Sequence, residues 1–188
     1  MKNPIIKYPL TLGIIGAICA FALAAVHGIT APIISERTAQ AALKAIQQID
    51  ANAEKVTNVT ADYSTYGDYD IDTIYEIETG NKVSAYAYQV SSMGYSADVV
   101  MLLVLDASSD TIIGYSTISQ AETKGGNFGD TLLSSPLFAK QFAGLSFSGV
   151  DSIDYVAGST AKVTMAAVKS GVNNAINYHV NVVLKGGK

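Results

Sequence analysis

The N-terminal part of the chain contains an uncharged apolar run that constrains everything after it. Residues 8–35 carry no formal charge, and residues 9–26 read PLTLGIIGAICAFALAAV. A membrane-spanning helix needs about 20 apolar residues to cross about 30 Å of hydrocarbon. We therefore predict a short N-terminal segment over residues 1–7 and a transmembrane anchor helix over residues 8–29.

The charges that flank this run indicate its orientation. Lys2 and Lys7 precede it, whereas Glu36 and Arg37 follow it and cancel. The positive-inside bias places residues 1–7 in the cytoplasm and everything beyond the anchor outside the cell membrane. A cleaved signal peptide is the alternative, because an Ala-Leu-Ala sequence in the run resembles a small-residue cleavage site. Cleavage there would cut the run internally, so we favour an uncleaved, single-pass anchor.

Composition excludes several classes of function. The 188-residue chain has a net charge of −4 and no basic block, which argues against a nucleic-acid partner. Cys19 is the only cysteine, and His27 and His179 are the only histidines. An intrachain disulfide is therefore impossible, and no metal site is expected. The chemistry must come from a bound organic group or from carboxylates and hydroxyls.

The chain beyond the anchor alternates helical and extended patterns. Residues 30–55 place apolar side chains at three- and four-residue steps after Pro32, which predicts an amphipathic helix. Residues 56–188 form the remaining domain. Its first part, residues 56–72, is polar and rich in turn formers, which predicts an irregular connection.

Four segments of this domain have the apolar or alternating patterns of strands, separated by turn residues such as Gly80-Asn81. They are Thr73–Glu78, Lys82–Ser92, Asp98–Asp106 and Thr111–Ser119. A short amphipathic piece over Pro136–Leu145 and a final helix of about 17 residues follow. Strands and helices in separate segments predict an α+β fold with a mainly antiparallel sheet and flanking helices.

The loop before the final helix, DYVAGSTAKVT over residues 154–164, has two interpretations. Ser and Thr are preferred helix N-caps, and most such residues do only that. The same geometry also makes an anion site, since the start of a helix attracts phosphate. Gly158 would let a phosphate approach the backbone, and Lys162 would add a positive charge.

A glycine-rich loop, AETKGGNFG over residues 121–129, is equally ambiguous. Its glycines serve a turn in the commoner case. In the functional case the loop lets a flat ring lie against the backbone, with Glu122 and Thr123 contacting the ring edge. The tyrosines of the strand region and His179 are interpreted as packing residues rather than ligands.

These segments together resemble a known family. The resemblance rests on TAPII after the anchor, GYSADVVMLLVLD, IIGYSTISQAETKGGNFG, LFAKQFAG and DYVAGST. In this order they resemble the FMN-binding G subunit of Rnf-type electron-transport complexes. The resemblance implies an extracytoplasmic domain in which a threonine of a Ser-Gly-Ala-Thr loop holds FMN through a phosphoester bond. A separate flavin transferase makes that bond from FAD. The domain is also similar to the C subunit of sodium-pumping quinone reductases.

Counted forward from Asp154, the resemblance places Thr160 at the FMN attachment position, with Ser159 and Gly158 in the phosphate loop. Where the family has Ser-Gly-Ala-Thr, this chain has Ala-Gly-Ser-Thr.

Counted backward from Ala167-Val168 without a gap, the same comparison places Lys162 at the attachment position. A lysine could not make the same phosphoester. Thr164 is then a second candidate hydroxyl, although we favour Thr160.

The glycine-rich loop corresponds to the family's Glu-Thr-Pro-Gly-Leu-Gly sequence. Glu122, Thr123 and Gly125 match, whereas Lys124 replaces proline. The resemblance implies that the three matching residues line the flavin pocket.

The resemblance implies an electron-transfer subunit, rather than a stand-alone catalyst, of an Rnf-like ion-translocating oxidoreductase. Its partners would be the membrane, other integral-membrane subunits and the flavin transferase. A flavin-free scaffold subunit of the same kind of complex is the first alternative. A pilin-like surface protein is the second, but the glycine–phenylalanine processing site and the glutamate inside the apolar helix are absent.

Overall fold

The computed structural model describes most of the chain after residue 42. The described residues are 12–13, 15–17, 19–21, 43–125, 128–156 and 161–186. The chain divides into two compact units, residues 1–41 and residues 42–188.

The described residues of the first unit are all helical and lie within the expected anchor. Leu12, Ile15 and Phe21 are exposed apolar side chains among them. In the part of the chain that the structure describes, no helix combines the length and the apolar character that crossing a bilayer requires. Residues 1–7 and most of the anchor lie outside the described residues, so the anchor stays a prediction.

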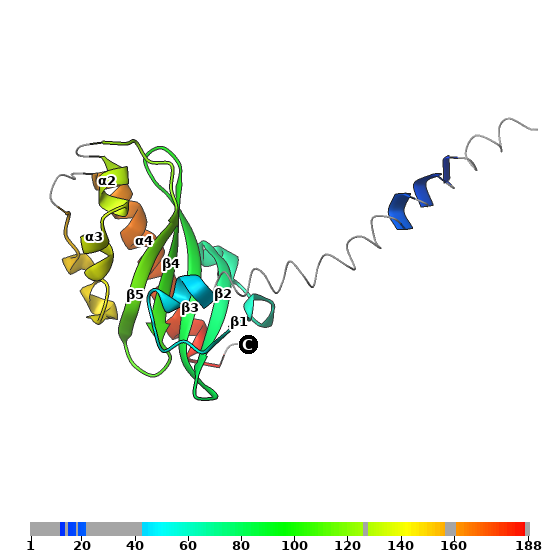
Figure 1. The fold of residues 1–188 in the computed structure, drawn as a ribbon, viewed down its shortest axis with the longest axis horizontal. Helices are drawn as coiled ribbons and strands as arrows, with labels where there is room; N and C mark the ends of the chain where they lie inside the picture. The colour runs from blue at the N-terminus through cyan, green and yellow to red at the C-terminus, as the bar shows by residue number, and fades with distance from the viewer. Residues whose placement is uncertain are drawn as a thin grey trace, which may run out of the picture. The chain divides into compact units, whose positions relative to one another are not determined.

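The second unit is built on a six-stranded sheet whose strands are antiparallel and neighbour one another in chain order (Figure 1). The strands are β1 (Lys55–Asn58), β2 (Ile71–Thr79), β3 (Lys82–Met93), β4 (Asp98–Asp106), β5 (Thr111–Ser119) and β6 (Leu145–Ser146). The predicted α+β fold with an antiparallel sheet is confirmed. Two of the four predicted strands, β4 and β5, have the predicted bounds.

The central strand β4 is continuously apolar because both faces of the sheet are covered. Met101, Leu103 and Leu105 belong to the larger core, whereas Leu102 and Val104 belong to a smaller core on the opposite face. Alternate residues of a strand point to opposite faces, so each core receives every second side chain.

Helical residues 43–47 cover the face that carries the smaller core (Figure 1). Ile46 is fully buried there. Ile49 follows the helical residues and packs against β5 at Gly114, where a Cβ would lie 2.5 Å from Ile49 Cγ2. The missing side chain at Gly114 therefore lets this segment approach the sheet.

The predicted hairpin turn between β2 and β3 is confirmed. Gly80 and Asn81 both adopt positive φ, 59° and 61°. Two-residue hairpin loops of this kind match the right-handed twist of the flanking strands, and glycine and asparagine tolerate the backbone conformation.

The two edge strands, β1 and β6, were not predicted from the sequence. Residues 56–72 were expected to be irregular, but β1 overlaps their first part and the short 3₁₀ helices η1 (Thr60–Asp62) and η2 (Tyr66–Tyr69) follow. The short amphipathic piece predicted over Pro136–Leu145 forms helix over Pro136–Lys140, and its last residue begins β6. Such short strands have no pattern of their own, because pairing with the neighbouring strand determines them.

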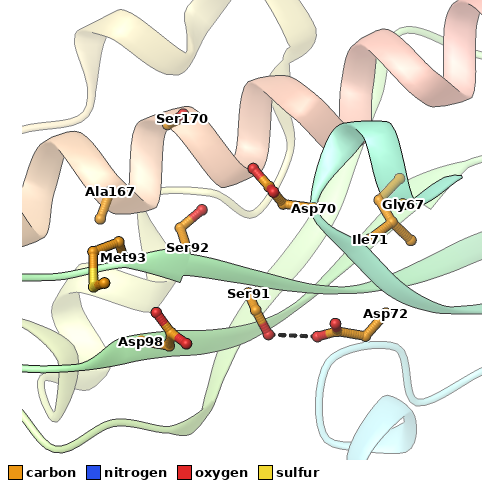
Figure 2. Close-up of a pocket in the computed structure, with 10 residues that line it drawn as sticks. All are labelled: Gly67, Asp70, Ile71, Asp72, Ser91, Ser92, Met93, Asp98, Ala167 and Ser170. Carbon is orange, nitrogen blue, oxygen red and sulfur yellow. Dashed lines mark hydrogen bonds between the residues drawn. The ribbon is translucent and has the colours of Figure 1, made fainter.

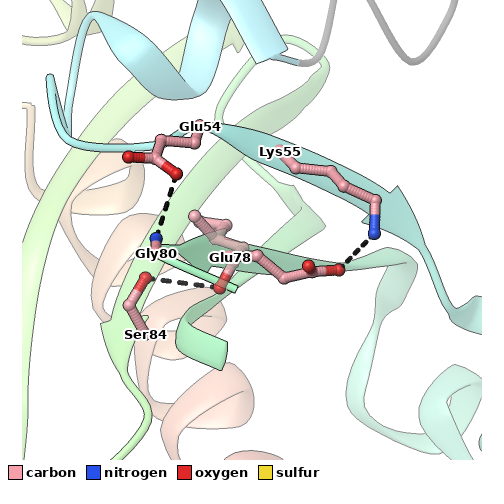
Figure 3. Close-up of polar contacts among 6 residues, drawn as sticks. Glu54, Lys55, Glu78, Gly80 and Ser84 are labelled. Carbon is pink, nitrogen blue, oxygen red and sulfur yellow. Dashed lines mark hydrogen bonds and ion pairs between the residues drawn. The ribbon is translucent and has the colours of Figure 1, made fainter. Parts of the chain in front are cut away.

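Polar contacts link β1, β2 and β3 near this edge of the sheet, as Figure 3 shows. Lys55 forms an ion pair with Glu78 of β2. The Glu54 carboxylate accepts a hydrogen bond of 3.0 Å from the backbone N–H of Gly80. The Ser84 hydroxyl donates to the backbone carbonyl of Ile77. Charged side chains on an edge strand also oppose pairing with other chains.

The larger core lies between the sheet and the C-terminal helices. These are α2 (Gly129–Leu133), α3 (Pro136–Lys140), the 3₁₀ helix η3 (Phe147–Ser152), α4 (Lys162–Tyr178) and the π-helical turn η4 (His179–Val183). The predicted final helix of about 17 residues is thus confirmed as α4. It contacts β3 and β4, the centre of the sheet.

His179, at the end of α4, is buried in the larger core, as expected for a packing residue. Its Nδ1 lies 2.7 Å from the Tyr88 hydroxyl, whereas its Nε2 has no partner among the described residues. Burial lowers the pKa of His179 to about 4, against the opposing influence of Asp106 and Asp110. The imidazole is therefore neutral at physiological pH.

Candidate functional site

A cavity of about 370 Å³ lies where three segments meet. The segments are the hairpin loop between β3 and β4, the glycine-rich loop after β5, and the start of α4. We call it the loop cavity. It is lined by Tyr95, Glu122, Thr123, Phe128, Gly129, Ala161, Lys162, Val163 and Thr164.

Glu122 is the polar centre of the loop cavity. Its side chain is buried, with the residue 4% exposed. Oε1 accepts hydrogen bonds from the backbone N–H groups of Tyr95 (2.8 Å) and Ser96 (3.1 Å). Oε2 accepts a hydrogen bond of 2.7 Å from the Thr164 hydroxyl. One carboxylate therefore ties all three segments together.

Two glycines make room for this carboxylate. A Cβ on Gly94 would lie 2.3 Å from Glu122 Oε1, and a Cβ on Gly129 would lie 2.5 Å from Glu122 Oε2 and from Thr164 Oγ1. Protein interiors leave no space for such overlaps, so any larger residue would displace the carboxylate. The glycines are therefore part of the wall that holds Glu122.

Further hydrogen bonds fix the glycine-rich loop from outside. Gln120 accepts a hydrogen bond from the backbone N–H of Glu122 (2.7 Å) and donates one to Asp130 of α2 (2.7 Å). The hydroxyls of Thr123 and Ser96 lie 3.1 Å apart. The backbone entering the cavity is thus held on both sides of Glu122.

The start of α4 gives the cavity its positive end. Lys162 is the first residue of this 17-residue helix, and it is exposed. The N-terminus of a helix carries a partial positive charge and attracts phosphate groups. Exposed apolar side chains line the same cavity: Tyr95, which is 72% exposed, Phe128 and Val163.

The structure brings four of the predicted site residues together: Glu122, Thr123, Lys162 and Thr164 all line the loop cavity. Gly125 lies in the same loop, at φ +94°, but does not line the cavity.

Gly158, Ser159 and Thr160 lie outside the described residues. Sequence reasoning did not single out Tyr95, Phe128 or Val163. Phe128 could have been identified from the sequence, because it lies next to the glycines of the predicted loop. Tyr95 could not be distinguished from the other tyrosines of the strand region.

Comparison with known proteins agrees with this geometry. Residues 1–49 match the RnfG N-terminal region. Residues 94–177 match the FMN-binding domain, and this range begins at Gly94 and includes every residue that lines the loop cavity. Two parts of the chain are therefore similar to two families, the RnfG N-terminal region and the FMN-binding domain. The expected resemblance to Rnf-type G subunits is confirmed.

The chain also has a distant relative over nearly its whole length. The sequence is 27% identical to the G subunit of the ion-translocating oxidoreductase complex of Stutzerimonas stutzeri. The alignment of 183 residues covers 90% of this chain and 78% of that protein.

The residues of the loop cavity suit an FMN molecule. Tyr95, Phe128 and Val163 offer apolar surface to a flat ring, and Lys162 at the start of α4 offers charge to a phosphate. Glu122 lines this cavity, and both of its oxygens accept hydrogen bonds from the protein, so it also positions the walls of the pocket. Its contact with the ring edge stays a prediction.

Proposed function

We propose that this chain is the FMN-carrying electron-transfer subunit of an Rnf-like ion-translocating oxidoreductase, held at the outer face of the cell membrane by its N-terminal helix. The loop cavity carries the proposal, because it combines apolar surface, a lysine at the start of a helix and a preformed hydrogen-bonded wall. FMN supplies the redox chemistry when bound, and the protein supplies position and electrostatics.

Each wall of the pocket has a separate task in this proposal. The exposed faces of Tyr95 and Phe128 hold the flavin ring near the surface, where another redox partner can approach it. Lys162 and the first turn of α4 neutralise the phosphate. Glu122 keeps the hairpin loop, the glycine-rich loop and α4 in register, so the pocket is formed before the cofactor enters.

We further propose that Thr160 is the attachment residue. The second candidate, Thr164, is buried and donates its hydroxyl hydrogen to Glu122 at 2.7 Å. With the residue only 1% exposed, this hydroxyl is poorly accessible to a flavin transferase. In the attachment reaction the Thr160 oxygen would form the bond to the FMN phosphorus of FAD, and AMP and the hydroxyl proton would leave.

A tether has a physical purpose at this location. An electron carrier outside the cytoplasm would lose a dissociated flavin to the surroundings. A phosphoester fixes the tail of the cofactor and leaves its ring free to contact partners. The membrane anchor then keeps the flavin domain beside the integral-membrane subunits of the complex.

The test is expression of the full chain in a host that contains the flavin transferase, followed by denaturing electrophoresis and intact-mass measurement. We expect a fluorescent band and the mass of one attached FMN. The Thr160→Ala variant should lose both, whereas Thr160→Ser should retain them. Thr164→Ala should keep the attached mass while losing stability.

One observation favours the alternative of a flavin-free scaffold. The backward alignment places Lys162 at the attachment position, where lysine cannot form the phosphoester. Thr164 is the remaining candidate in that alignment, and its hydroxyl is already bonded to Glu122. A colourless wild-type chain of unmodified mass from the same host would support the scaffold and contradict the electron carrier.

A further inference from the structure

A second cavity, of about 610 Å³, is lined in part by the strand ends of the hairpin between β3 and β4. We call it the acidic pocket. Figure 2 shows its lining residues, which come from η2 and β2, from the β3–β4 hairpin and from α4. Its polar side chains are Asp70, Asp72, Asp98, Ser91, Ser92 and Ser170.

The three carboxylates of the acidic pocket have no cationic partner in the described part of the chain, where the ion pair found joins Lys55 to Glu78. Asp72 accepts a hydrogen bond from the Ser91 hydroxyl, as the dashed line in Figure 2 marks. Asp70 accepts a bond of 3.2 Å from the Asn174 amide. All three residues are exposed and can be reached from outside. The pocket therefore presents uncompensated negative charge.

A buried hydroxyl gives the second, independent observation. Ser92 is 8% exposed, and its hydroxyl has no hydrogen-bond partner among the described residues. It lines the pocket and faces α4 at Gly171, where a Cβ would lie 2.8 Å from Ser92 Oγ. Because Ser92 lines the pocket, its hydroxyl is available to a ligand there, and it can accept a hydrogen bond as well as donate one.

The described residues give no indication of a bound metal ion as that ligand. Within the described residues, no three His, Cys, Asp or Glu side chains converge closely enough to hold one. An arginine side chain suits the arrangement better, because its planar guanidinium has five N–H donors and no acceptor. It can reach separated carboxylates and a serine hydroxyl at once.

We propose that the acidic pocket binds an arginine of another protein subunit, and so docks that subunit beside the loop cavity. The two cavities are lined by different residues of the same hairpin and of the same helix, α4. Asp98 pairs with Met93 across the hairpin whose loop residues Tyr95 and Ser96 contact Glu122. Ser170 lies on α4 beyond Lys162. The docking role rests on the proposed electron-transfer function, whereas the binding of arginine does not.

The experiment measures binding of a fluorescein-labelled pentapeptide, Gly-Ser-Arg-Ser-Gly, to the purified full chain in detergent by fluorescence anisotropy. The comparison peptide carries citrulline, which has the shape of arginine without its charge. We expect the arginine peptide to bind at least tenfold more tightly, which corresponds to about 1.4 kcal/mol. Equal binding of the two peptides, or no binding of the arginine peptide, would overturn the proposal.

The variants Asp70→Asn and Asp98→Asn locate the site. Asparagine tolerates the left-handed backbone of Asp70, φ +57°, so the first variant should fold. Each variant should weaken binding of the arginine peptide by about tenfold. Asp151→Asn removes the same charge from an exposed position outside the pocket and should leave binding unchanged. An equal effect of all three variants would show a general charge effect and overturn the assigned site.

Attached FMN, measured on the same preparations, separates the two proposals. Asp70→Asn and Asp98→Asn should keep the flavin content of the wild type, because neither residue lines the loop cavity. A flavin-free chain that still binds the arginine peptide would contradict the electron carrier alone. A flavin-carrying chain that does not discriminate arginine from citrulline would contradict the acidic pocket alone.

Discussion

The loop cavity and the acidic pocket are both lined by residues of the β3–β4 hairpin, yet their carboxylates have opposite environments. In the loop cavity, Glu122 is buried and its oxygens accept hydrogen bonds from two backbone N–H groups and one hydroxyl. In the acidic pocket, three aspartates are exposed and the buried Ser92 hydroxyl has no partner among the described residues. Burial and hydrogen bonding therefore distinguish Glu122, which holds the cavity wall together, from the three aspartates, which are available to a ligand.

This comparison predicts that Glu122→Ala has the largest effect on the domain. The variant leaves two backbone donors and the Thr164 hydroxyl without their acceptor, so the free energy of unfolding should fall by about 4 kcal/mol. Urea denaturation of the full chain measures this. Glu54→Ala is the control, because its carboxylate accepts one exposed bond from Gly80 and its loss should be less than about 1 kcal/mol. Equal losses would remove the distinction.

His179 provides an intermediate case, with one nitrogen bonded to Tyr88 and the other unpartnered among the described residues. Its pKa falls from 6.5 to about 4 on folding. The unfolded chain therefore binds the proton first, and stability is lost as the pH falls from 6.5 towards 4, by up to about 3 kcal/mol. Above pH 6.5 the lowered pKa has no effect.

The His179→Phe variant should lose this part of the pH dependence. Chemical denaturation at several pH values between 4 and 7 compares the variant with the wild type. The Tyr88 hydroxyl loses its partner at every pH, so the variant should be less stable at pH 7 while its profile is flatter. An unchanged profile would show that His179 is not buried as a neutral imidazole.

Gly129→Ala tests the space around Glu122 with a single methyl group. The added Cβ would overlap Glu122 and Thr164, so we expect a loss of about 2 kcal/mol and a reduced FMN content. Gly67→Ala is the control, since nothing lies within 4 Å of its added Cβ. Thermal unfolding and flavin absorbance report the two effects. Equal stability and FMN content of Gly129→Ala and Gly67→Ala would show that the residues around Glu122 can move to accept the added methyl group.

Asp98→Asn should have the smallest effect on stability. Its carboxylate is exposed and lies in a pocket with two other aspartates, so neutralising it changes the free energy of unfolding by less than about 0.5 kcal/mol. The same variant should weaken arginine binding. A large loss of stability would place Asp98 with Glu122 as a structural carboxylate.

The long strands could be predicted from the sequence, whereas the short ones could not. β4 and β5 have their predicted bounds, because a run of apolar or alternating residues indicates which side chains of the strand are buried. β1 and β6 have four and two residues, and their pairing depends on the strand beside them. Polar residues on β1 looked like a loop when taken alone.

The residue types of the loop cavity were likewise available from the sequence, but their arrangement was not. Glu122, Thr123, Lys162 and Thr164 were candidates, and they do share one cavity. The direction of the Glu122 side chain depends on Gly94 and on the backbone of Tyr95, which are distant in the sequence. The acidic pocket was missed entirely, because its aspartates come from two separate segments, one at the start of β2 and one at the start of β4.

The sequence by itself determined the α+β class, the central strands, the final helix and the kinship with FMN-binding domains, because periodic apolar patterns and short motifs act locally. Only the tertiary structure decided which carboxylate is buried and which are open to a ligand. The burial of a carboxylate depends on whether backbone N–H groups distant in the sequence lie within hydrogen-bond distance of it. A sequence pattern does not give those distances.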